Sequence, residues 1–176
     1  MKENRQYKII LAGDDGVGKT AFAQKHLTGV FEQRYIATRG VKVYPVTIET
    51  ENPIIFNVWD TAGQEKLGGL PTEYYINADA AIVMFDLTGA NTFKNLQFWI
   101  NGIRKVCQAA PVVIVGTKSD IKNGRKVPPS YTDLIIKRFD CIAYHEISTK
   151  TGENCDDAFL TIAQYLGNDG RSNANL

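Results

Sequence analysis

The sequence predicts an α/β protein built on a doubly wound, mostly parallel six-stranded sheet with one antiparallel edge strand. Short apolar runs alternate along the chain with segments whose apolar residues recur at helical spacing. One glycine-rich stretch joins the first apolar run directly to a helical segment. This alternation is typical of parallel sheets that carry helices on both faces and bind ligands at the carboxyl ends of their strands. We therefore expect the functional residues to follow the apolar runs.

The first half of the chain contains the predicted antiparallel hairpin. Residues 7–12 are typical of a buried strand, and residues 21–27 show a helical pattern. The alternating segment 41–48 predicts a half-exposed strand, and the Asn-Pro pair at 52–53 predicts a turn into a further strand at 54–59. These last two strands form the hairpin, which supplies the edge strand.

The second half continues the alternation of strands and helices. An apolar stripe that begins at Phe93 and ends at Val106 recurs at helical spacing, and a Pro-Pro-Ser sequence marks the start of a later helix. The elements predicted here are a strand at 79–85, a helix at 93–106, a strand at 111–116, a helix from Pro128, a strand at 141–144 and a helix at 159–166.

Residues 13–20, Gly-Asp-Asp-Gly-Val-Gly-Lys-Thr, match the pattern of a phosphate-binding loop between a strand and a helix. Glycines let successive backbone N–H groups point at a pyrophosphate, and the following helix adds the positive end of its dipole. Lys19 is the candidate for contact with the β- and γ-phosphates, and Thr20 for coordination of Mg²⁺. The candidate nucleotide contacts here are Asp14, Asp15, Gly16, Val17, Gly18, Lys19, Thr20 and Ala21. A glycine-rich turn without a ligand is the alternative.

The segment Thr117-Lys118-Ser119-Asp120 follows the strand predicted at 111–116. A carboxylate at that position can accept hydrogen bonds from N1–H and the exocyclic amine of guanine, a donor pair that adenine lacks. The aliphatic stem of Lys118 can lie over the base. Asp120 therefore predicts selection of guanine, although taken alone the tetrapeptide could also be a polar loop that caps a helix.

The segment that begins at Asp60 follows the strand predicted at 54–59. An aspartate at a strand end can hold Mg²⁺, and Gly63 can bring its backbone N–H close to a γ-phosphate. Gln64 carries the donor and the acceptor needed to orient an attacking water. We therefore expect Gln64 and Lys19 to be catalytic, with a turn capped by Asp60 as the alternative.

Together these motifs resemble the Ras superfamily of small GTPases, from about Tyr7 to Leu166, and most closely its nuclear-transport branch, Ran. The resemblance to Ran rests on several short segments, which include Tyr35-Ile36-Ala37-Thr38, Val43-Tyr44-Pro45, Gly68-Gly69-Leu70 and Asp120-Ile121-Lys122. It implies a P-loop GTPase fold. It also implies that Tyr35 contacts the nucleotide, that Thr38 joins Thr20 and Asp60 as a Mg²⁺ ligand, and that the guanine loop is Ser148-Thr149-Lys150.

The same resemblance implies a switch that binds and hydrolyses GTP and cycles between GTP and GDP with Mg²⁺. The γ-phosphate would order two loops, one around Thr38 and one from Gly63 to Tyr75. The implied partners are importin- and exportin-type receptors, a GTPase-activating protein and a guanine nucleotide exchange factor. The implied location is the nucleus and the cytoplasm.

Several residues depart from the family pattern. Asp15 stands where Ran and Ras carry glycine, and a carboxylate beside the γ-phosphate should slow hydrolysis. Thr117 replaces the usual asparagine, as in Rho-type GTPases, and Arg39 replaces a leucine of Ran. The pair Lys137-Arg138 is a short remnant of Ran's basic stretch, and the acidic tail of Ran is absent.

The overall composition agrees with one globular domain. The chain has 176 residues, 44% of them hydrophobic, and a formal net charge of +1, which gives no electrostatic case for nucleic acid or anionic lipid as a direct partner. Its three cysteines favour a reducing compartment. We expect a flexible N-terminus at 1–6, the GTPase domain at 7–167 and a flexible tail at 168–176, with no membrane anchor visible in the sequence.

Three other functions stay open on the sequence. Asp15 favours a GTP-dependent binding module that does not hydrolyse GTP. A membrane-traffic GTPase of Rab or Rho type would use a lipidated tail, which this ending does not offer. An ATP-dependent phosphotransferase is disfavoured because Asp120 cannot find its donor pair on adenine.

Overall fold

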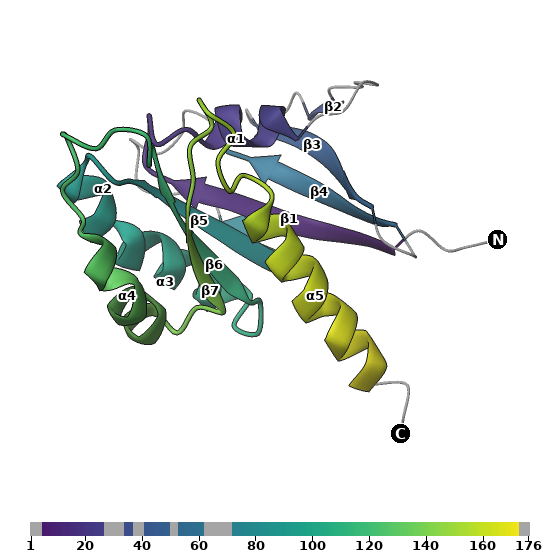
Figure 1. The fold of residues 1–176 in the computed structure, drawn as a ribbon. Helices are drawn as coiled ribbons and strands as arrows, with labels where there is room; N and C mark the ends of the chain where they lie inside the picture. Colours follow the sequence, from purple (N-terminus) through teal and green to yellow (C-terminus); the bar gives the residue numbers. More distant parts are fainter. Residues whose placement is uncertain (1–4, 27–33, 37–40, 50–52, 62–71, 173–176) are drawn as a thin grey trace.

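The computed structural model of the protein describes residues 5–26, 34–36, 41–49, 53–61 and 72–172 (Figure 1). Its strands are β1 (Arg5–Gly13), β2 (Arg34–Ile36), β3 (Val41–Ile48), β4 (Ile54–Asp60), β5 (Ala80–Asp86), β6 (Val112–Thr117) and β7 (Ala143–Glu146). Its α-helices are α1 (Lys19–Lys25), α2 (Ala90–Lys94), α3 (Leu96–Val106), α4 (Thr132–Phe139) and α5 (Asp157–Ser172), and short 3₁₀ helices cover Thr72–Tyr74 and Pro129–Tyr131.

The strands form one sheet in the order β2-β3-β4-β1-β5-β6-β7. From β4 to β7 all neighbours are parallel, whereas β3 runs antiparallel to both β2 and β4. The predicted doubly wound, mostly parallel sheet with one antiparallel strand is therefore confirmed. The structure adds β2, which has three residues and pairs outside β3. A strand this short is below the length at which apolar periodicity can indicate it.

Helices cover both faces of the sheet and create two apolar layers. On one face Phe22 of α1 stacks on Phe159 of α5, with ring centroids 5.2 Å apart, in a core that also contains β-strand residues. On the other face Trp99 of α3 and Phe139 of α4 belong to the second core. Because both faces are buried, the central parallel strands read as continuous apolar runs in the sequence.

Strand β1 shows how this two-sided burial leads to the site. Ile9 packs in the core of one face and Ile10 in the core of the other, and both are fully buried. At the end of β1 the backbone of Gly13 has φ +140°, and a Cβ there would lie 2.2 Å from the carbonyl oxygen of Met84 in β5. Only glycine allows β1 to approach β5 this closely as the chain enters the next loop.

The boundaries of several predicted elements differ from those of the structure. The single helix predicted at 93–106 is two helices, α2 and α3, which meet at Asn95. The last strand begins at Ala143 instead of residue 141, because the N–H of Cys141 still bonds the carbonyl of Ile136 at the end of α4. Helix α5 continues to Ser172, beyond the domain boundary placed at residue 167.

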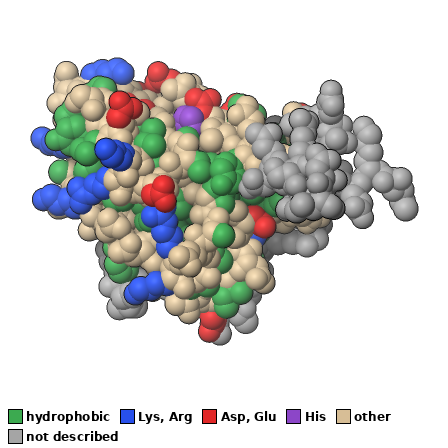
Figure 2. Space-filling model, turned by 90° about the horizontal axis from the view of Figure 1, so that it is seen from below, with side chains coloured by type: hydrophobic (Ala, Val, Ile, Leu, Met, Phe, Trp, Pro, Cys, Tyr) green, Lys and Arg blue, Asp and Glu red, His purple; other side chains and the backbone are tan. Residues whose placement is uncertain are grey.

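Charged side chains of both signs mix with apolar ones on the face drawn in Figure 2, where Lys and Arg lie mainly toward the left. The last turns of α3 and α4 carry basic residues, namely Arg104, Lys105, Lys137 and Arg138. Within the described ranges, no helix combines the length and the apolar character that a membrane span requires.

Candidate nucleotide-binding site

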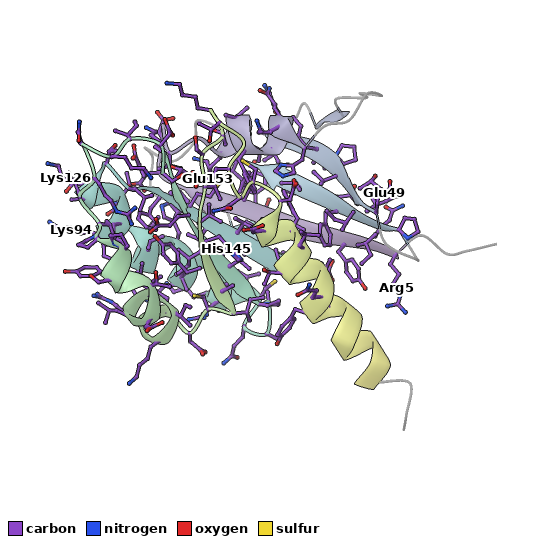
Figure 3. The ribbon with its side chains drawn as sticks, in the orientation of Figure 1. Arg5, Glu49, Lys94, Lys126, His145 and Glu153 are labelled. Atoms are coloured by element: carbon purple, nitrogen blue, oxygen red, sulfur yellow. The ribbon has the colours of Figure 1, made fainter. Side chains whose placement is uncertain are left out.

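The described candidate residues gather at one end of the sheet, where β1, β4 and β6 end and their loops begin. In Figure 3 the side chains of Lys126 and Glu153 lie at this end, whereas those of Arg5 and Glu49 lie at the opposite end. Carboxyl ends of parallel strands are where open α/β sheets bind ligands. The positions of the three motifs in the fold therefore agree with the sequence analysis.

The loop after β1 has the backbone conformation that a phosphate-binding loop needs. Gly16 and Gly18 have φ of +78° and +98°, a left-handed region that other residues rarely adopt, and Gly18 is the residue that precedes α1. A pocket of about 230 Å³ lies against the loop and the first turn of α1. Its lining residues are Asp15, Gly16, Gly18, Lys19, Thr20 and Ala21.

Lys19 is only 5% exposed, although it carries a charged group. Its Nζ donates hydrogen bonds to the carbonyl oxygens of Gly13 and Asp14, at 2.7 and 2.9 Å. A buried ammonium needs such partners because its desolvation is costly. The loop therefore holds the ammonium beside the pocket, where a phosphate oxygen could replace a carbonyl as its acceptor.

Thr20 and Asp60, two of the predicted Mg²⁺ ligands, are in direct contact. Thr20 Oγ1 donates to Asp60 Oδ2 at 2.6 Å, and Asp60 Oδ1 is buried with no hydrogen-bond partner among the described residues. Burial raises the pKa of Asp60, and the bond from Thr20 and the charge of Lys19 oppose that rise. A buried carboxylate oxygen without a donor is the kind of atom that a cation or its water shell would satisfy.

The oxygen ligands at Thr20 and Asp60 fit Mg²⁺ chemically. The part of the chain that the structure describes contains no group of three or more His, Cys, Asp or Glu suited to a metal ion. Mg²⁺ typically binds one or two carboxylates together with phosphate oxygens and waters, without a cage made entirely of protein. One hydroxyl and one carboxylate beside a phosphate loop satisfy that requirement.

Contacts with the phosphate loop and with the end of β5 hold the base-reading segment in place. Thr117 Oγ1 donates to the carbonyl of Val17 at 2.8 Å, which joins this segment to the phosphate loop. Lys118 has a positive φ of 63°, and its Nζ lies 2.6 Å from Asp86 Oδ2. The two motifs that the sequence predicts separately are therefore parts of one hydrogen-bonded unit.

Asp120 is hydrogen-bonded to Ser148, the first residue of the Ser148-Thr149-Lys150 loop. Ser148 Oγ donates to Asp120 Oδ1 at 2.7 Å, and this bond lowers the pKa of Asp120. Ser148 is fully buried, its N–H bonds the carbonyl of Glu153, and its Oγ also accepts from the N–H of Thr151. Asp120 is thus held as a carboxylate, the form that accepts hydrogen bonds from guanine.

Some predicted site residues lie outside the described residues. These are Thr38, Gly63 and Gln64, together with Arg39 and the Gly68-Gly69-Leu70 segment of the Ran resemblance. Tyr35 lies in β2, but the structure describes only the backbone there. The roles expected for these residues stay predictions.

Two acidic residues that no sequence motif singled out support the base-reading segment. Asp86 ends β5 and pairs with Lys118, and Glu153 Oε2 accepts from Ser119 Oγ at 3.1 Å. Burial acts to raise the pKa of Asp86, but hydrogen bonds from Lys118 and Thr88 outweigh it and lower the pKa. Asp86 directly follows an apolar run, as Asp60 does, so the same signal could have found it. No such sequence signal indicates Glu153, because it does not follow an apolar run.

The doubly wound sheet, the glycine loop and its buried lysine define a nucleotide-binding domain of the phosphate-loop class. A comparison with protein families adds the family itself, because residues 8–168 match the Ras family. This protein belongs to the Ras family. Its domain is that of a GTP-binding switch, since members of the family bind guanine nucleotide with Mg²⁺, hydrolyse GTP and interact with GTPase-activating and nucleotide exchange proteins.

Proposed function

We propose that this protein is a Ran-type GTP-binding switch that controls importin- and exportin-type transport receptors. The observation that carries the nucleotide assignment is the unit described above, in which Thr117 bonds the phosphate loop while Ser148 holds the Asp120 carboxylate. That unit offers a phosphate site and a guanine acceptor on connected loops. The Ran assignment is supported by sequence, through Val43-Tyr44-Pro45 in β3 and the Gly68-Gly69-Leu70 segment.

Each site residue has a role in this proposal. Lys19 binds the β- and γ-phosphates, the backbone of residues 14–21 surrounds them, and Asp120 reads guanine with Lys118 over the base. Thr20, Thr38 and Asp60 hold Mg²⁺, which neutralises charge on the phosphates when it is bound. Gln64 orients the attacking water, and the domain that carries these residues is the segment 7–167.

We further propose that hydrolysis is slow. Asp15 is exposed and lines the pocket beside Lys19 and Thr20. A carboxylate there places negative charge close to the position where negative charge develops in the transition state. The same observation favours a second function, a GTP-dependent binding module with little or no turnover, and single-turnover hydrolysis by the purified protein separates the two.

For the partners, we propose GTP-dependent binding to receptors with an acidic inner surface, in the nucleus and the cytoplasm. Lys137 and Arg138 are exposed in the last turn of α4 and form only a short basic stretch. Salt screens the attraction between exposed charges, and here only a short basic stretch would contribute such attraction. Receptor binding should therefore be more salt-tolerant than that of a Ran with a fuller basic stretch.

Three experiments test this proposal. Nucleotide released from the purified protein and identified by chromatography should be GTP or GDP, and adenine nucleotide would contradict the base assignment. Importin-type receptors should then be captured by the GTP-loaded form and not by the GDP-loaded form. Equal capture in both states would favour another branch of the superfamily, and membrane fractionation of the full-length protein would identify a Rab- or Rho-type role.

A further inference from the structure

The second residue of the phosphate loop, Asp14, directs its carboxylate away from the pocket and toward helix α3. Trp99 Nε1 donates to Asp14 Oδ1 at 2.8 Å, and Asn95 Nδ2 donates to Asp14 Oδ2 at 2.7 Å. Each carboxylate oxygen therefore has its own side-chain donor. Trp99 is only 3% exposed in the core beneath α3, so the position of its ring is fixed by packing.

The backbone of the same residue takes part in holding the phosphate-site lysine. Lys19 Nζ donates to the carbonyl oxygen of Asp14 at 2.9 Å. In Asp14 only three bonds separate the carboxylate carbon Cγ from the backbone carbonyl carbon. A change of the χ1 rotamer therefore moves the carboxylate through several ångströms relative to that carbonyl. An Asp14 side chain without its two donors would therefore reach the neighbourhood of the Lys19 ammonium.

A carboxylate in that position would compete with the nucleotide. A hydrogen bond between an ammonium and a carboxylate is stronger than one to a neutral carbonyl, because both groups are charged. A phosphate can displace a carbonyl from Lys19 more readily than it can displace a carboxylate. The carboxylate would also repel the phosphates that the loop must surround.

We propose that Trp99 and Asn95 act as a clamp that holds the Asp14 carboxylate away from Lys19 and so keeps the ammonium available to phosphate. Trp99 is then a positioning residue for phosphate binding, although it is not among the residues that line the pocket. The inference rests on the proposed nucleotide site and explains how a phosphate loop tolerates an acidic residue. It also connects the loop to the junction of α2 and α3, where Asn95 lies.

A double-mutant cycle on GDP affinity in the presence of Mg²⁺ tests the clamp. Trp99→Phe keeps an aromatic ring but removes the donor, and releasing the carboxylate should weaken GDP binding about tenfold, as expected for one charged competitor. Asp14→Ala removes the clamped carboxylate, and with it the competitor for Lys19. Its loss of GDP affinity should therefore be clearly smaller than that of Trp99→Phe. The double variant should match Asp14→Ala, which means that removing Asp14 rescues Trp99→Phe.

Several outcomes would overturn the clamp. A merely structural contact predicts equal losses in both single variants, and no rescue in the double variant. Wild-type affinity in Trp99→Phe would also overturn it. Trp59→Phe is the matched control, because Trp59 and Trp99 are the two tryptophans of the chain, and it should leave GDP affinity close to wild type. If Trp99→Phe does not fold, Asn95→Ala replaces it in the cycle, because Asn95 is exposed. Asn95→Ala also removes one donor to the Asp14 carboxylate, and its loss of GDP affinity should be smaller.

Failure of the clamp can be distinguished from failure of the proposed function. If the wild type binds no guanine nucleotide, the proposed function is wrong, and the cycle is repeated with inorganic pyrophosphate, for which the clamp predicts the same order of affinities. If the wild type binds GDP but the rescue is absent, only the clamp is wrong. The indole N–H resonance of Trp99 should also shift in Asp14→Ala, whereas that of Trp59 should not.

Discussion

The base side and the phosphate side of the candidate site differ in what their side chains contact. On the base side Lys118, Ser119 and Asp120 are held by residues that have no place in the phosphate site, namely Asp86, Glu153 and Ser148. On the phosphate side Lys19 bonds carbonyls of its own loop, and Thr20 bonds Asp60. On the phosphate side, the atoms that make these contacts are the ones that phosphate and Mg²⁺ would bind, namely Lys19 Nζ, Thr20 Oγ1 and Asp60 Oδ2.

This difference indicates that the two sides serve binding in different ways. Contacts that persist on binding pre-organise a site and reduce the ordering required of it. Contacts that are exchanged for ligand contacts make the local structure depend on which ligand is present. We therefore expect the base side to determine which nucleotide binds, and the phosphate side to determine how the protein responds to its γ-phosphate.

The largest expected effect is a change of base preference on the base side. Asp120→Asn replaces an acceptor by a group that also donates, so GTP should lose affinity and xanthosine triphosphate, with its extra carbonyl, should gain it. Sites that hydrogen-bond a substrate directly discriminate by about 10⁴-fold, and we expect a change in relative affinity of that order. Competition binding with both nucleotides measures it, with Asp133→Asn on the exposed face of α4 as the control. Unchanged GTP affinity would show that Asp120 does not read the base.

A second prediction concerns turnover on the phosphate side. Asp15→Gly should accelerate hydrolysis stimulated by an activating protein while leaving GTP affinity nearly unchanged. Activating proteins contribute about 10³–10⁵ in rate in Ras systems, which are relatives of this protein. If Asp15 blocks part of that assistance, its removal should increase the stimulated rate about 10²-fold.

Single-turnover rates with one activating protein, measured for the wild type and the variant, check this prediction. Asp15→Asn separates the two causes, because it keeps the bulk of the side chain and removes its charge. Equal rates for wild type and Asp15→Gly would mean that the carboxylate is accommodated and that the switch cycles normally.

The third prediction tests the exchange of contacts at Lys19. Lys19→Ala should weaken binding of GTP and GDP by about 10²-fold, because two or more charge-assisted bonds to phosphate are lost. Lys25→Ala, at an exposed position on the same short helix, should bind like the wild type. Isothermal titration with each nucleotide gives the comparison, and similar affinities for the two lysine variants would remove Lys19 from the site.

The smallest expected effect concerns the support of the base side by Asp86. Hydrogen bonds from Lys118 and Thr88 outweigh burial and lower the pKa of Asp86. A carboxyl group whose pKa is lowered in the folded state contributes stability above its unfolded pKa, and that contribution disappears as the pH falls through the folded pKa. Because Lys118 is 39% exposed, Asp86→Asn should cost about 1 kcal/mol at pH 7.

Thermal unfolding at several pH values checks this prediction. At pH 7 the melting temperature of Asp86→Asn should be lower than that of the wild type by about 2–4 °C, the shift typical of a domain of this size. The difference should shrink only as the pH falls below the usual range of an aspartate carboxyl and through the lowered pKa of Asp86, where the wild-type carboxylate becomes protonated. A difference that is constant with pH would assign the loss to packing instead of charge.

Much of the fold was predictable because local sequence carries its signals. The apolar runs predicted β1, β4, β5 and β6. In β5 and β6 every residue is buried, because a strand covered on both faces needs consecutive apolar residues. Strand β2 and the division of one predicted helix at Asn95 were not predictable in this way. Their existence depends on pairing with β3 and on packing against other elements, which no short window of sequence contains.

In the candidate site too, some features follow from local sequence and others depend on tertiary contacts. The sequence alone predicts the phosphate loop, the strand-end Asp60 and the base-reading segment, because each is a short motif whose chemistry lies within a few consecutive residues. The support of Lys118 by Asp86 and the hydrogen bond from Trp99 to the Asp14 carboxylate, 85 positions apart in the chain, are visible only in the folded protein. The physical reason is that a hydrogen bond depends on distance in space, and the parallel sheet brings together strand ends that are far apart in sequence.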